Sequence, residues 1–509
     1  MLDFIVLAAG SLLPVLAMPN EVFPEGWAFL GPLILVPVFW FTARRGLLVS
    51  ALGGALWISL VTLLSQFWLL SFHPLAFPLV LAFQIPWYAA AFWVSSFLWR
   101  RFPRSGLWFQ ALAWTFFEFI RIQGFFSYPY GAIAASLWSW PLAFQSADLV
   151  GSSGLTFLLA WASAWFAALG GRTIPWPRLR LDLAAGLGLW ALDLGYGLWK
   201  WNQPETGLVW KPALVQHSQD PWRGGASAYE AGFDRLEALS QKAQETHPDV
   251  IIWSETAFVP SVEYHHRYHD NPDSLLLVRR LEAFLTSVPI PFLLGNDHRE
   301  KAADDTIRDY NAVLAWNGGW SGRYEKNRLV PFTESFPYKE QLPWVYHWLL
   351  SADTHFWEPG RGRTLLHAGS VVVGTPICFE DAFPDGARAF SLAGAQALVN
   401  LTNDSWAAGK ASRMQHLSLA VFRAIETRLP LVRAGNDGAT AAVSSRGELL
   451  SLLPIGPPGV LQAEVRLGSG TVTFYTQTGD CFPWAAGGIV LVGVILGWRK
   501  TVVDKGGQL

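Results

Sequence analysis

The sequence predicts an α-helical membrane bundle of about eight spans and an α/β domain that lies outside the cytoplasm between spans seven and eight. Three observations lead to this fold class. Hydrophobic residues make up 51% of the 509 positions and charged residues only 15%, and the charges are sparse before about residue 201. Long apolar segments recur in that first part. Short β-like runs then alternate with amphipathic stretches over residues 207–474.

Seven apolar segments in the first part and one near the end approach the length of a bilayer-spanning helix. The first segment lacks the basic leader of a signal peptide, and a second apolar segment follows closely, so we expect it to be retained as a helix. The predicted spans lie near Phe4–Met18, Trp27–Thr42, Leu47–Leu70, Leu75–Trp99, Leu107–Ile120, Leu155–Leu169, Leu181–Trp199 and Phe482–Trp498.

The charges of the connecting loops predict the orientation of the spans. Basic residues follow spans two, four, six and eight, whereas the intervening loops carry almost none. The positive-inside rule makes the basic side cytoplasmic, so both termini are expected there and the large domain outside the cytoplasm. The expected domains are residues 1–206, 207–474 and 475–509. The basic residues are Arg44, Arg45, Arg100, Arg101, Arg104, Arg172, Arg178, Arg180, Arg499 and Lys500.

The soluble segment alternates predicted strands with predicted helices, which favours one layered α/β core. Some 270 residues suffice for such a core. The strands are expected at Pro212–Gln216, Val250–Trp253, Pro291–Gly295, Ala312–Trp316, Ser370–Ile377 and Ala397–Leu401. The helices are expected at Ala228–Thr246, Pro272–Ser287, Ala382–Leu392 and Ser412–Arg428.

The single cysteine of this segment, Cys378, lies where a predicted buried strand ends in a Gly-Thr-Pro interruption. A thiol at such a turn can present its sulfur to a pocket while backbone N–H groups point at the group that it attacks. The alternative is a buried core cysteine without chemistry. The only other cysteine, Cys481, lies at the start of the last span, and a disulfide between the two would contradict a catalytic role.

Two further segments hold the partners that a thiol nucleophile needs. Glu255 follows the predicted strand Val250–Trp253, a position suited to a general base, although an acid at a strand end is more often a solvated cap. Lys326 lies in Arg323–Pro337, which concentrates charges among prolines and aromatics; the alternative there is a salt-bridged surface loop. Together, the glutamate can take the thiol proton, the sulfur attack an acyl carbon, and the lysine stabilise the oxyanion.

These segments resemble the motifs of the nitrilase, or carbon–nitrogen hydrolase, superfamily. The matching runs are Trp253–Glu255, Lys326–Phe332, Gly374–Glu380 and Leu401–Trp406, in this order. Eight spans around an extracytoplasmic domain of this kind resemble the bacterial apolipoprotein N-acyltransferase family. The resemblance covers essentially the whole chain and implies that the soluble domain is a nitrilase-like αββα sandwich.

The resemblance also implies a role for each matching residue. Glu255 is expected to be the general base, Lys326 the oxyanion stabiliser and Cys378 the nucleophile. Glu334, eight residues after the lysine, matches the family's second acid, which supports the lysine and the base. Glu380 matches the acid that follows the nucleophile by two positions.

Further matches concern substrate contacts. Trp222 matches an aromatic residue near the active-site mouth, and with Trp406 it is a candidate for the apolar wall that keeps water from a thioester. Phe379 stands where tyrosine is usual, Ser254 where proline is common, and Thr333 where glycine is usual. The backbone N–H of Phe379 remains for an oxyanion hole, so these departures bear on substrate preference.

The reaction that the resemblance implies has two steps. The cysteine first takes a fatty acyl chain from a glycerophospholipid as a thioester, and the α-amino group of a diacylglyceryl-modified apolipoprotein then takes the acyl chain. Such a transfer from ester to amide calls for no cofactor and no metal. The net charge of −2 gives no reason to expect nucleic acid as a partner.

One polar pair lies inside an expected span. Glu118 and Arg121 are three residues apart and therefore share a helix face. The first interpretation is a structural ion pair; the second is that Arg121 lies near the outer interface and contacts a lipid phosphate.

Three alternatives to this function stay open. A membrane-anchored amidase would use the same residues but deliver the acyl group to water. A paralogous acyltransferase would use another amine acceptor, which Phe379 leaves open. A non-catalytic membrane scaffold would retain the fold without the chemistry. The presence of all four residues of the catalytic motifs argues against it, namely Glu255, Lys326, Glu334 and Cys378.

Overall fold

The computed structural model describes residues 1–72, 75–219, 224–351, 354–468 and 470–506, which form two compact units. The first unit comprises Met1–Gln203, Ala407–Phe422 and Thr473–Leu509. The second comprises Pro204–Trp406 and Arg423–Val472. The assignment of Ala407–Phe422 to the first unit was not expected from the sequence.

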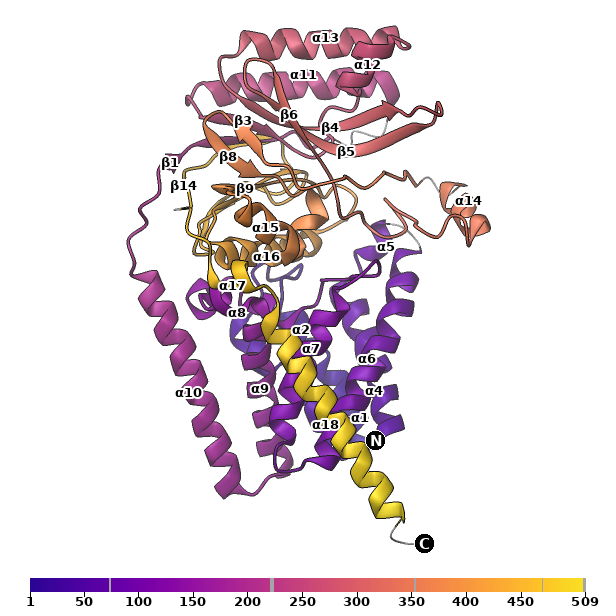
Figure 1. The fold of residues 1–509 in the computed structure, drawn as a ribbon, viewed down its shortest axis with the longest axis vertical. Coiled ribbons are helices and arrows are strands. Elements are labelled where there is room, and N and C mark those ends of the chain that lie inside the picture. Colours follow the sequence, from indigo (N-terminus) through magenta and orange to yellow (C-terminus); the bar gives the residue numbers. More distant parts are fainter. Residues whose placement is uncertain (73–74, 220–223, 352–353, 469, 507–509) are drawn as a thin grey trace. The chain divides into compact units, whose positions relative to one another are not determined.

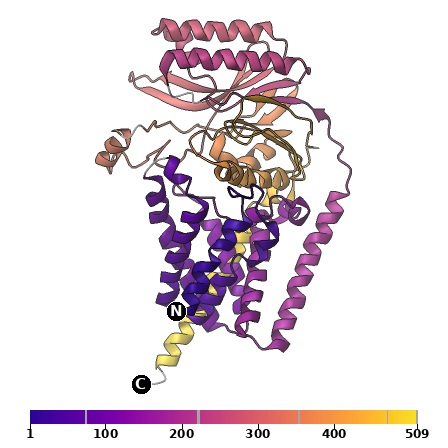
Figure 2. The ribbon, with the colours of Figure 1, turned by 180° about the vertical axis from the view of Figure 1, so that it is seen from behind.

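The first unit is helical. In it α4 packs along α6, as both ribbon views show (Figures 1 and 2), and α7 packs against α6, α9 and α18. Within the described residues, four helices are long and apolar enough to cross a membrane, namely α4, α6, α9 and the Cys481–Arg499 part of α18. The α-helices are α1 (Leu2–Gly10), α2 (Leu12–Ala17), α3 (Val36–Arg44), α4 (Leu47–Ser65), α5 (Leu69–Phe72), α6 (Ala76–Arg101), α7 (Gly106–Arg121), α8 (Ala147–Val150), α9 (Ser152–Gly171), α10 (Trp176–Trp201), α17 (Phe474–Thr478) and α18 (Cys481–Gly506). The 3₁₀ helices are η1 (Ala28–Leu33), η2 (Ile133–Leu137) and η3 (Pro141–Phe144).

Prolines interrupt the first two expected spans. Pro14 has no N–H, and its ring clashes with the carbonyl group four residues earlier, so α1 ends at Gly10 and α2 begins at Leu12. Pro32 lies inside η1, and Pro37 lies in the first turn of α3. The two segments therefore form shorter apolar helices with a local break, over Leu2–Ala17 and Ala28–Arg44.

Helix α10 covers the seventh expected span, but its polar side chains keep it below the hydropathy of the four long apolar helices. Neighbouring groups satisfy these side chains. Asp182 accepts a hydrogen bond from Trp108 Nε1 at 2.9 Å and pairs with Arg178 at 3.4 Å. Tyr196 donates to Asp148 at 2.8 Å. Such contacts hold a helix in an apolar bundle because an unpaired polar group there is costly.

The second unit contains two six-stranded sheets that pack face to face through β2 and β10. The first sheet has the order β13-β2-β3-β4-β5-β6, and the second has the order β12-β11-β10-β9-β8-β7. A short ribbon of β1 and β14 accompanies them. The strands are β1 (Val209–Trp210), β2 (Pro212–Gln216), β3 (Val250–Trp253), β4 (Phe292–Lys301), β5 (Ile307–Trp316), β6 (Trp320–Glu325), β7 (Leu366–Ala368), β8 (Val371–Gly374), β9 (Ala397–Asn403), β10 (Leu431–Asn436), β11 (Ala441–Val443), β12 (Leu449–Leu452), β13 (Gly459–Gln462) and β14 (Val465–Arg466).

Helices cover the outer faces of the two sheets, which makes the unit an αββα sandwich. Helices α11 and α13 lie side by side over the first sheet in both views (Figures 1 and 2), and α15 packs on β8 of the second. The rings of Phe233 from α11 and Phe284 from α13 meet 6.2 Å apart and bury the helix faces against Trp253 of β3. The helices of this unit are α11 (Gly225–Gln244), α12 (Val262–Tyr268), α13 (Pro272–Ser287), α14 (Pro343–Ser351), α15 (Pro384–Leu392) and the 3₁₀ helix η4 (Cys378–Ala382). Helix α16 (Lys410–Thr427) belongs to the first unit up to Phe422 and to the second from Arg423.

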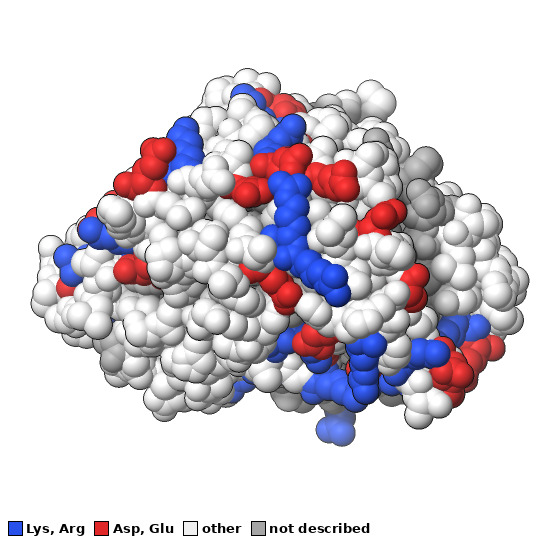
Figure 3. All heavy atoms as spheres, turned by 90° about the horizontal axis from the view of Figure 1, so that it is seen from above, with Lys and Arg blue, Asp and Glu red and all other residues white. Residues whose placement is uncertain are grey.

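The surface seen from above the view of Figure 1 carries acidic and basic side chains interspersed (Figure 3). The pairing between α11 and α13 is of this kind, since Arg280 reaches Asp234 and Glu237 at 2.7 Å each. Exposed pairs of this type contribute little to stability, typically below about 1 kcal/mol. The helices are therefore held mainly by their buried apolar faces.

Candidate active site

The Cys378 sulfur lies at a turn that follows β8. Strand β8 ends at Gly374, earlier than the expected end at Ile377, because Pro376 has no N–H to donate to a ladder. One further bridge joins Ile377 to Leu401 of β9, and η4 then starts at Cys378 itself. The side chain is buried, and both Cys378 and Cys481 are free thiols.

The backbone at Cys378 is left-handed, with a φ of +48°. Such a conformation is strained for any residue with a Cβ and persists only where the surroundings enforce it. Asn400 of β9 supplies part of that enforcement, because its Nδ2 donates to the carbonyl oxygens of Pro376 and Cys378, both at 3.1 Å. A buried amide thus clamps the two sides of the turn.

Glu255 enters the same site from the first sheet, just after β3. Its Oε1 accepts a hydrogen bond from Asn311 Nδ2 at 2.7 Å and one from Lys326 Nζ at 3.2 Å. Its Oε2 accepts one from the Asn403 backbone N–H, at the end of β9, at 2.7 Å. Donors from both sheets therefore fix the plane of this buried carboxylate.

Lys326 directly follows β6 and is also buried. Its Nζ lies 2.8 Å from Glu334 Oε1, besides its contact with Glu255. The other oxygen of Glu334 accepts the Val330 N–H at 2.8 Å, which closes the loop between lysine and glutamate. The ammonium therefore lies between two carboxylates.

Burial and neighbouring charges set the protonation states. Burial alone would lower the pKa of Lys326, but the carboxylates of Glu255 and Glu334 outweigh it and hold that pKa well above its usual value. Burial and the Glu255 charge raise the pKa of Cys378 well above its usual value, against the opposing Lys326 charge. The site therefore rests with a charged ammonium and a neutral thiol, and a nucleophile here needs a base at the moment of attack.

Glu380 ties the cysteine turn to the lysine loop. It accepts hydrogen bonds from the backbone N–H groups of Ile377, Asn327 and Arg328 at 2.8, 2.8 and 2.9 Å. The Tyr324 hydroxyl of β6 donates to it at 2.9 Å. Burial raises the pKa of Glu380 despite these donors. Its position makes it a brace between the two sheets.

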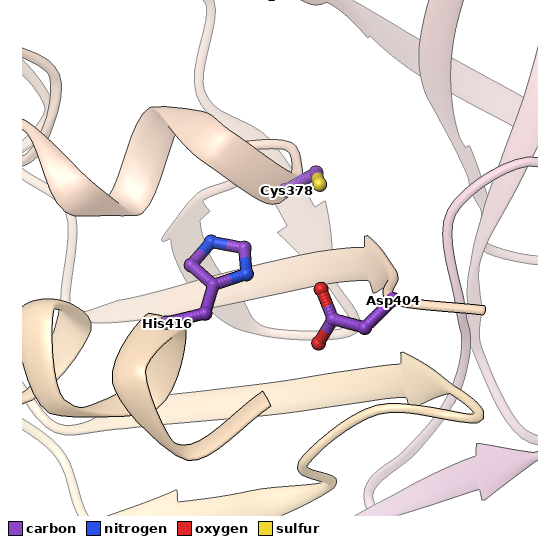
Figure 4. A group of neighbouring side chains, drawn as sticks. All are labelled: Cys378, Asp404 and His416. Atoms are coloured by element: carbon purple, nitrogen blue, oxygen red, sulfur yellow. The ribbon is translucent and has the colours of Figure 1, made fainter. Parts of the chain in front are cut away.

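A buried ionic triad lies behind the cysteine turn. Arg433 of β10 donates to Asp381 at 2.6 Å and to Asp404 at 2.9 Å. Figure 4 shows Asp404 on the loop after β9 with its carboxylate turned toward the space that holds the sulfur, and a carboxylate oxygen lies within 4.8 Å of Cys378 Sγ. This second negative charge also contributes to the raised pKa of Cys378.

The remaining predicted site residues have other surroundings. Phe379 is buried, and its ring packs edge-on against Phe383 at 4.8 Å. Trp406 is half-buried on the loop after β9. Trp222 lies outside the described residues.

Arg121 and Glu118, both in the first unit, have separate partners. Arg121 Nη1 donates to the carbonyl oxygens of Tyr128 and Tyr130 at 2.7 and 2.9 Å. Glu118 accepts from Trp114, the Ile133 N–H and Thr156. The structure shows no direct ion pair between these two described residues, against the first interpretation: Glu118 accepts from neutral donors, and only Nη1 of Arg121 is hydrogen-bonded, to backbone carbonyl oxygens.

Sequence reasoning missed Asn311, Asn400, Tyr324 and Arg433. Tyr324 and Asn400 precede a motif by one or two residues, whereas Asn311 and Arg433 lie far from all four motifs in the sequence. A signal did exist for Asn400, because its amide interrupts the apolar run Ala397–Leu401, and a buried amide needs partners.

The chain is similar to two protein families. Residues 211–473 match carbon–nitrogen hydrolases, and residues 10–165 match the N-terminal domain of apolipoprotein N-acyltransferases. Apolipoprotein N-acyltransferase 1 of Treponema denticola is 36% identical, over 94% of this chain and 93% of the relative. Apolipoprotein N-acyltransferase 1 of Treponema pallidum is 36% identical over 94% and 92%. The apolipoprotein N-acyltransferase of Geobacter metallireducens is 30% identical over 98% and 96%.

Among solved structures, the chain is similar to an amidase from Nesterenkonia sp. The identity is 18% and the TM-score 0.37, over 53% of this chain and 92% of the amidase.

Proposed function

This chain belongs to the apolipoprotein N-acyltransferase family, and from that premise we propose that it acylates lipoproteins through a thioester on Cys378. The acyl donor is a glycerophospholipid, and the acceptor is the α-amino group of a diacylglyceryl-modified apolipoprotein. One observation carries the assignment of residues: a buried ammonium lies between two carboxylates and within electrostatic reach of a buried thiol at a strained turn. Such an arrangement suits acyl transfer.

The first step takes the acyl group from the phospholipid. Glu255 accepts the thiol proton as Cys378 Sγ attacks the ester carbonyl carbon. Lys326 Nζ, with the Phe379 N–H, stabilises the negative oxygen of the tetrahedral intermediate. The intermediate then expels the lysophospholipid oxygen, which takes the proton back from Glu255. Thioester and lysophospholipid result.

The second step transfers the acyl group to the amine. The neutral α-amino group attacks the thioester carbon, and Glu255 takes the proton that the nitrogen must lose. Collapse of the intermediate breaks the carbon–sulfur bond and returns this proton to the thiolate. Glu334 and Glu380 act indirectly, because Glu334 keeps Lys326 charged and in place, and Glu380 holds the loop that presents it.

The membrane setting supports this substrate class. We propose eight spans in a bacterial inner membrane, with both termini in the cytoplasm and the catalytic domain, residues 207–474, in the periplasm. The loop charges support this sidedness. A phospholipid ester lies at the bilayer interface, where an enzyme anchored by apolar helices can reach it.

Arg121 is proposed as a contact for the donor phosphate. Its side chain is buried, and its Nε and Nη2 have no hydrogen-bond partner among the described residues. Two N–H groups of one guanidinium suit a phosphate oxygen pair, and an unmatched buried donor is costly. Trp222 and Trp406 are proposed as apolar contacts that keep water from the thioester.

The test separates the two half-reactions. The purified protein is incubated with phospholipid alone, and Cys378 is inspected by mass spectrometry for an acyl adduct; a diacylglyceryl peptide is then added. We expect the adduct to form and then to pass to the peptide nitrogen. Cys378→Ala should abolish both, and Glu255→Gln should block the adduct. A normal adduct in Glu255→Gln would remove Glu255 from the role of base.

The same experiment addresses the amidase alternative. Release of free fatty acid without N-acyl peptide would favour a membrane-anchored hydrolase. Transfer to another amine in preference to the diacylglyceryl peptide would favour a paralogous acyltransferase. Arg121→Gln is expected to raise the KM for phospholipid about tenfold while leaving the reactivity of the formed thioester unchanged.

A further inference from the structure

An apolar groove runs between α7 and α18 in the first unit. Its volume is about 410 Å³, and no charged side chain lines it. Gly488 of α18 leaves the space open, whereas Gly493 lets the Phe109 ring of α7 approach α18 closely. The lining residues are Phe102, Phe109, Ala485, Gly488, Ile489, Val492, Gly493 and Leu496.

The length of the groove matches one lipid leaflet. Its α18 side extends from Ala485 to Leu496, which at about 1.5 Å per residue corresponds to about 16 Å. The hydrocarbon core of a bilayer is about 30 Å thick, so one leaflet is about half of that. A slot of this length and apolar character suits a single acyl chain.

Basic residues gather at one end of the groove. Arg101 lies at this end, since its Cγ is 3.1 Å from the position that a Cβ on Gly497 would occupy. Arg104, two residues after Phe102, and Arg499, three after Leu496, are both exposed. The segments 102–109 and 485–499 contain no Asp or Glu. The groove therefore combines an apolar slot with a positively charged end.

We propose that this groove binds one anionic phospholipid, with an acyl chain between α7 and α18 and the phosphate at Arg104 and Arg499. Basic pockets beside transmembrane helices select anionic headgroups, because the phosphate meets two cations where the apolar slot ends. The basic end of the groove lies beside the start of α7, whereas Arg121, the proposed contact for the donor phosphate, is the last residue of that helix, so this lipid is not the acyl donor. It fills space between α7 and α18 and so stabilises their packing.

A glycine in the groove wall can be replaced to test whether the groove binds lipid. A Cβ on Gly488 would meet nothing within 4 Å, so Gly488→Leu fills the groove without a clash. Gly493 is unsuitable, because a Cβ there would lie 2.6 Å from the Phe109 ring. Gly188→Leu is the matched control, since Gly188 of α10 is likewise exposed and open, and the change raises helix propensity equally.

The experiment measures melting temperature and bound lipid in nanodiscs. One set contains phosphatidylcholine alone, and the other an equimolar mixture with phosphatidylglycerol, all with ether-linked chains that offer no ester for transfer. The mixture should raise the melting temperature of the wild-type protein and of Gly188→Leu by about 3 °C, whereas Gly488→Leu should gain nothing. Native mass spectrometry should find one phosphatidylglycerol fewer on Gly488→Leu.

The arginines are tested in the same way. The double variant Arg104→Gln with Arg499→Gln should lose the phosphatidylglycerol effect, whereas Arg180→Gln, an exposed arginine of α10, should keep it.

An equal gain in wild type and Gly488→Leu would overturn the site. A wild-type melting temperature that is the same in the mixture as in phosphatidylcholine alone would overturn the charge preference, and a dimer that Gly488→Leu dissociates would assign the groove to a second copy of the chain instead. Donor-dependent thioester formation should be unchanged in Gly488→Leu, which separates this proposal from the proposed function.

Discussion

Lys326 shows most directly how single residues set the chemistry of the site. A buried ammonium is unfavourable in isolation, and it is retained here because Glu255 and Glu334 both contact it. The same pairing keeps the lysine charged, which is what an oxyanion stabiliser requires. Stability and catalysis therefore depend on the same three charges.

Replacing Lys326 by methionine is expected to separate these two contributions. The variant should lose acyl transfer by about 10²- to 10³-fold, because the oxyanion loses its cation. It should also lose about 3–5 kcal/mol of unfolding free energy, because the carboxylates of Glu255 and Glu334 lose the cation between them. Thermal unfolding and thioester formation measure the two effects.

A second variant checks the cause. Adding Glu334→Gln to Lys326→Met should restore part of the stability but none of the activity, because it removes an unpaired charge without supplying a cation. The exposed Lys339→Met serves as control and should behave as wild type. Full activity in Lys326→Met would contradict the assigned role.

Asn311 is predicted to be a positioning residue for Glu255. Its Nδ2 donates to Glu255 at 2.7 Å, and its Oδ1 has no partner among the described residues, so truncation removes one interaction only. Asn311→Ala should slow thioester formation by about tenfold, the effect of one hydrogen bond to a charged group, with the KM for phospholipid unchanged.

The control for this prediction is Asn317→Ala. Asn317 lies just beyond the same strand, β5, but binds Ser321 and the His367 carbonyl oxygen at the surface. It should leave the rate unchanged. A higher KM with an unchanged kcat in Asn311→Ala would instead place Asn311 in substrate binding.

At the scale of elements, the turn after β8 carries conformational strain. Cys378→Gly should be more stable than Cys378→Ala by about 1 kcal/mol, because glycine alone adopts a φ of +48° without penalty. Both variants are inactive, so melting temperatures in the same lipid isolate the backbone effect. Equal stability would mean that the turn relaxes when the sulfur is removed.

The sequence predicted those elements whose pattern is decided locally. Strands β2 and β3 have the expected bounds because they are short, apolar and buried on both faces, and α13 begins at the expected Pro272 after an Asn271 cap. Strand β6 was missed because its Trp-Ser-Gly-Arg-Tyr-Glu run is polar and its inner face is recognisable only against β5. Strand β10 was missed for a similar reason, because Arg433 and Asn436 interrupt its apolar run.

The sequence likewise predicted some residues of the candidate site and missed others. Glu255, Lys326 and Cys378 follow strands or close motifs, so their types and positions could be read from the chain. Their hydrogen-bond partners come from β5 and β9, whose register with the motif strands is a property of the folded sheets. The sequence alone does not predict this register, because it depends on which strands pair in the folded sheets.

At the scale of the whole molecule, stability should depend on pH through Asp297. Burial and the charge of Asp309 raise its pKa from 3.8 to about 7, and its Oδ1 has no partner among the described residues. Between those values the folded chain holds a proton that the unfolded chain releases, so stability falls as pH rises through this window. Asp297→Asn should therefore stabilise the protein at about pH 8, by about 2 kcal/mol or more, with little effect at about pH 4.

Melting temperatures of the full chain at both pH values measure this difference. The exposed Glu340→Gln is the control and should shift neither value. Asp309→Asn should act in the opposite direction at neutral pH, because Asp309 binds Arg299 at 2.6 Å. A gain in Asp297→Asn that is equal at both pH values would exclude the titration of Asp297 as its cause.

The sidedness of the membrane domain can be tested with a native thiol. Cys481 is exposed at the start of α18, where the loop charges predict the periplasmic side. In a Cys378→Ala background, an impermeant maleimide should label Cys481 in intact spheroplasts. A cysteine at the exposed Arg104 should be labelled only after lysis, provided Cys481 is removed. Reversed labelling would invert the proposed topology.

Helix α16 has a practical consequence. Its residues up to Phe422 belong to the first unit, where Gln415 donates to the carbonyl oxygens of Pro19 and Ser65, while Arg423–Thr427 belong to the second. A fragment of residues 207–474 would leave Gln415 without those acceptors and would separate Ala407–Phe422 from the rest of the first unit. A truncated enzyme of that kind should aggregate, so lipid-free assays of this chemistry will need the full-length protein in detergent.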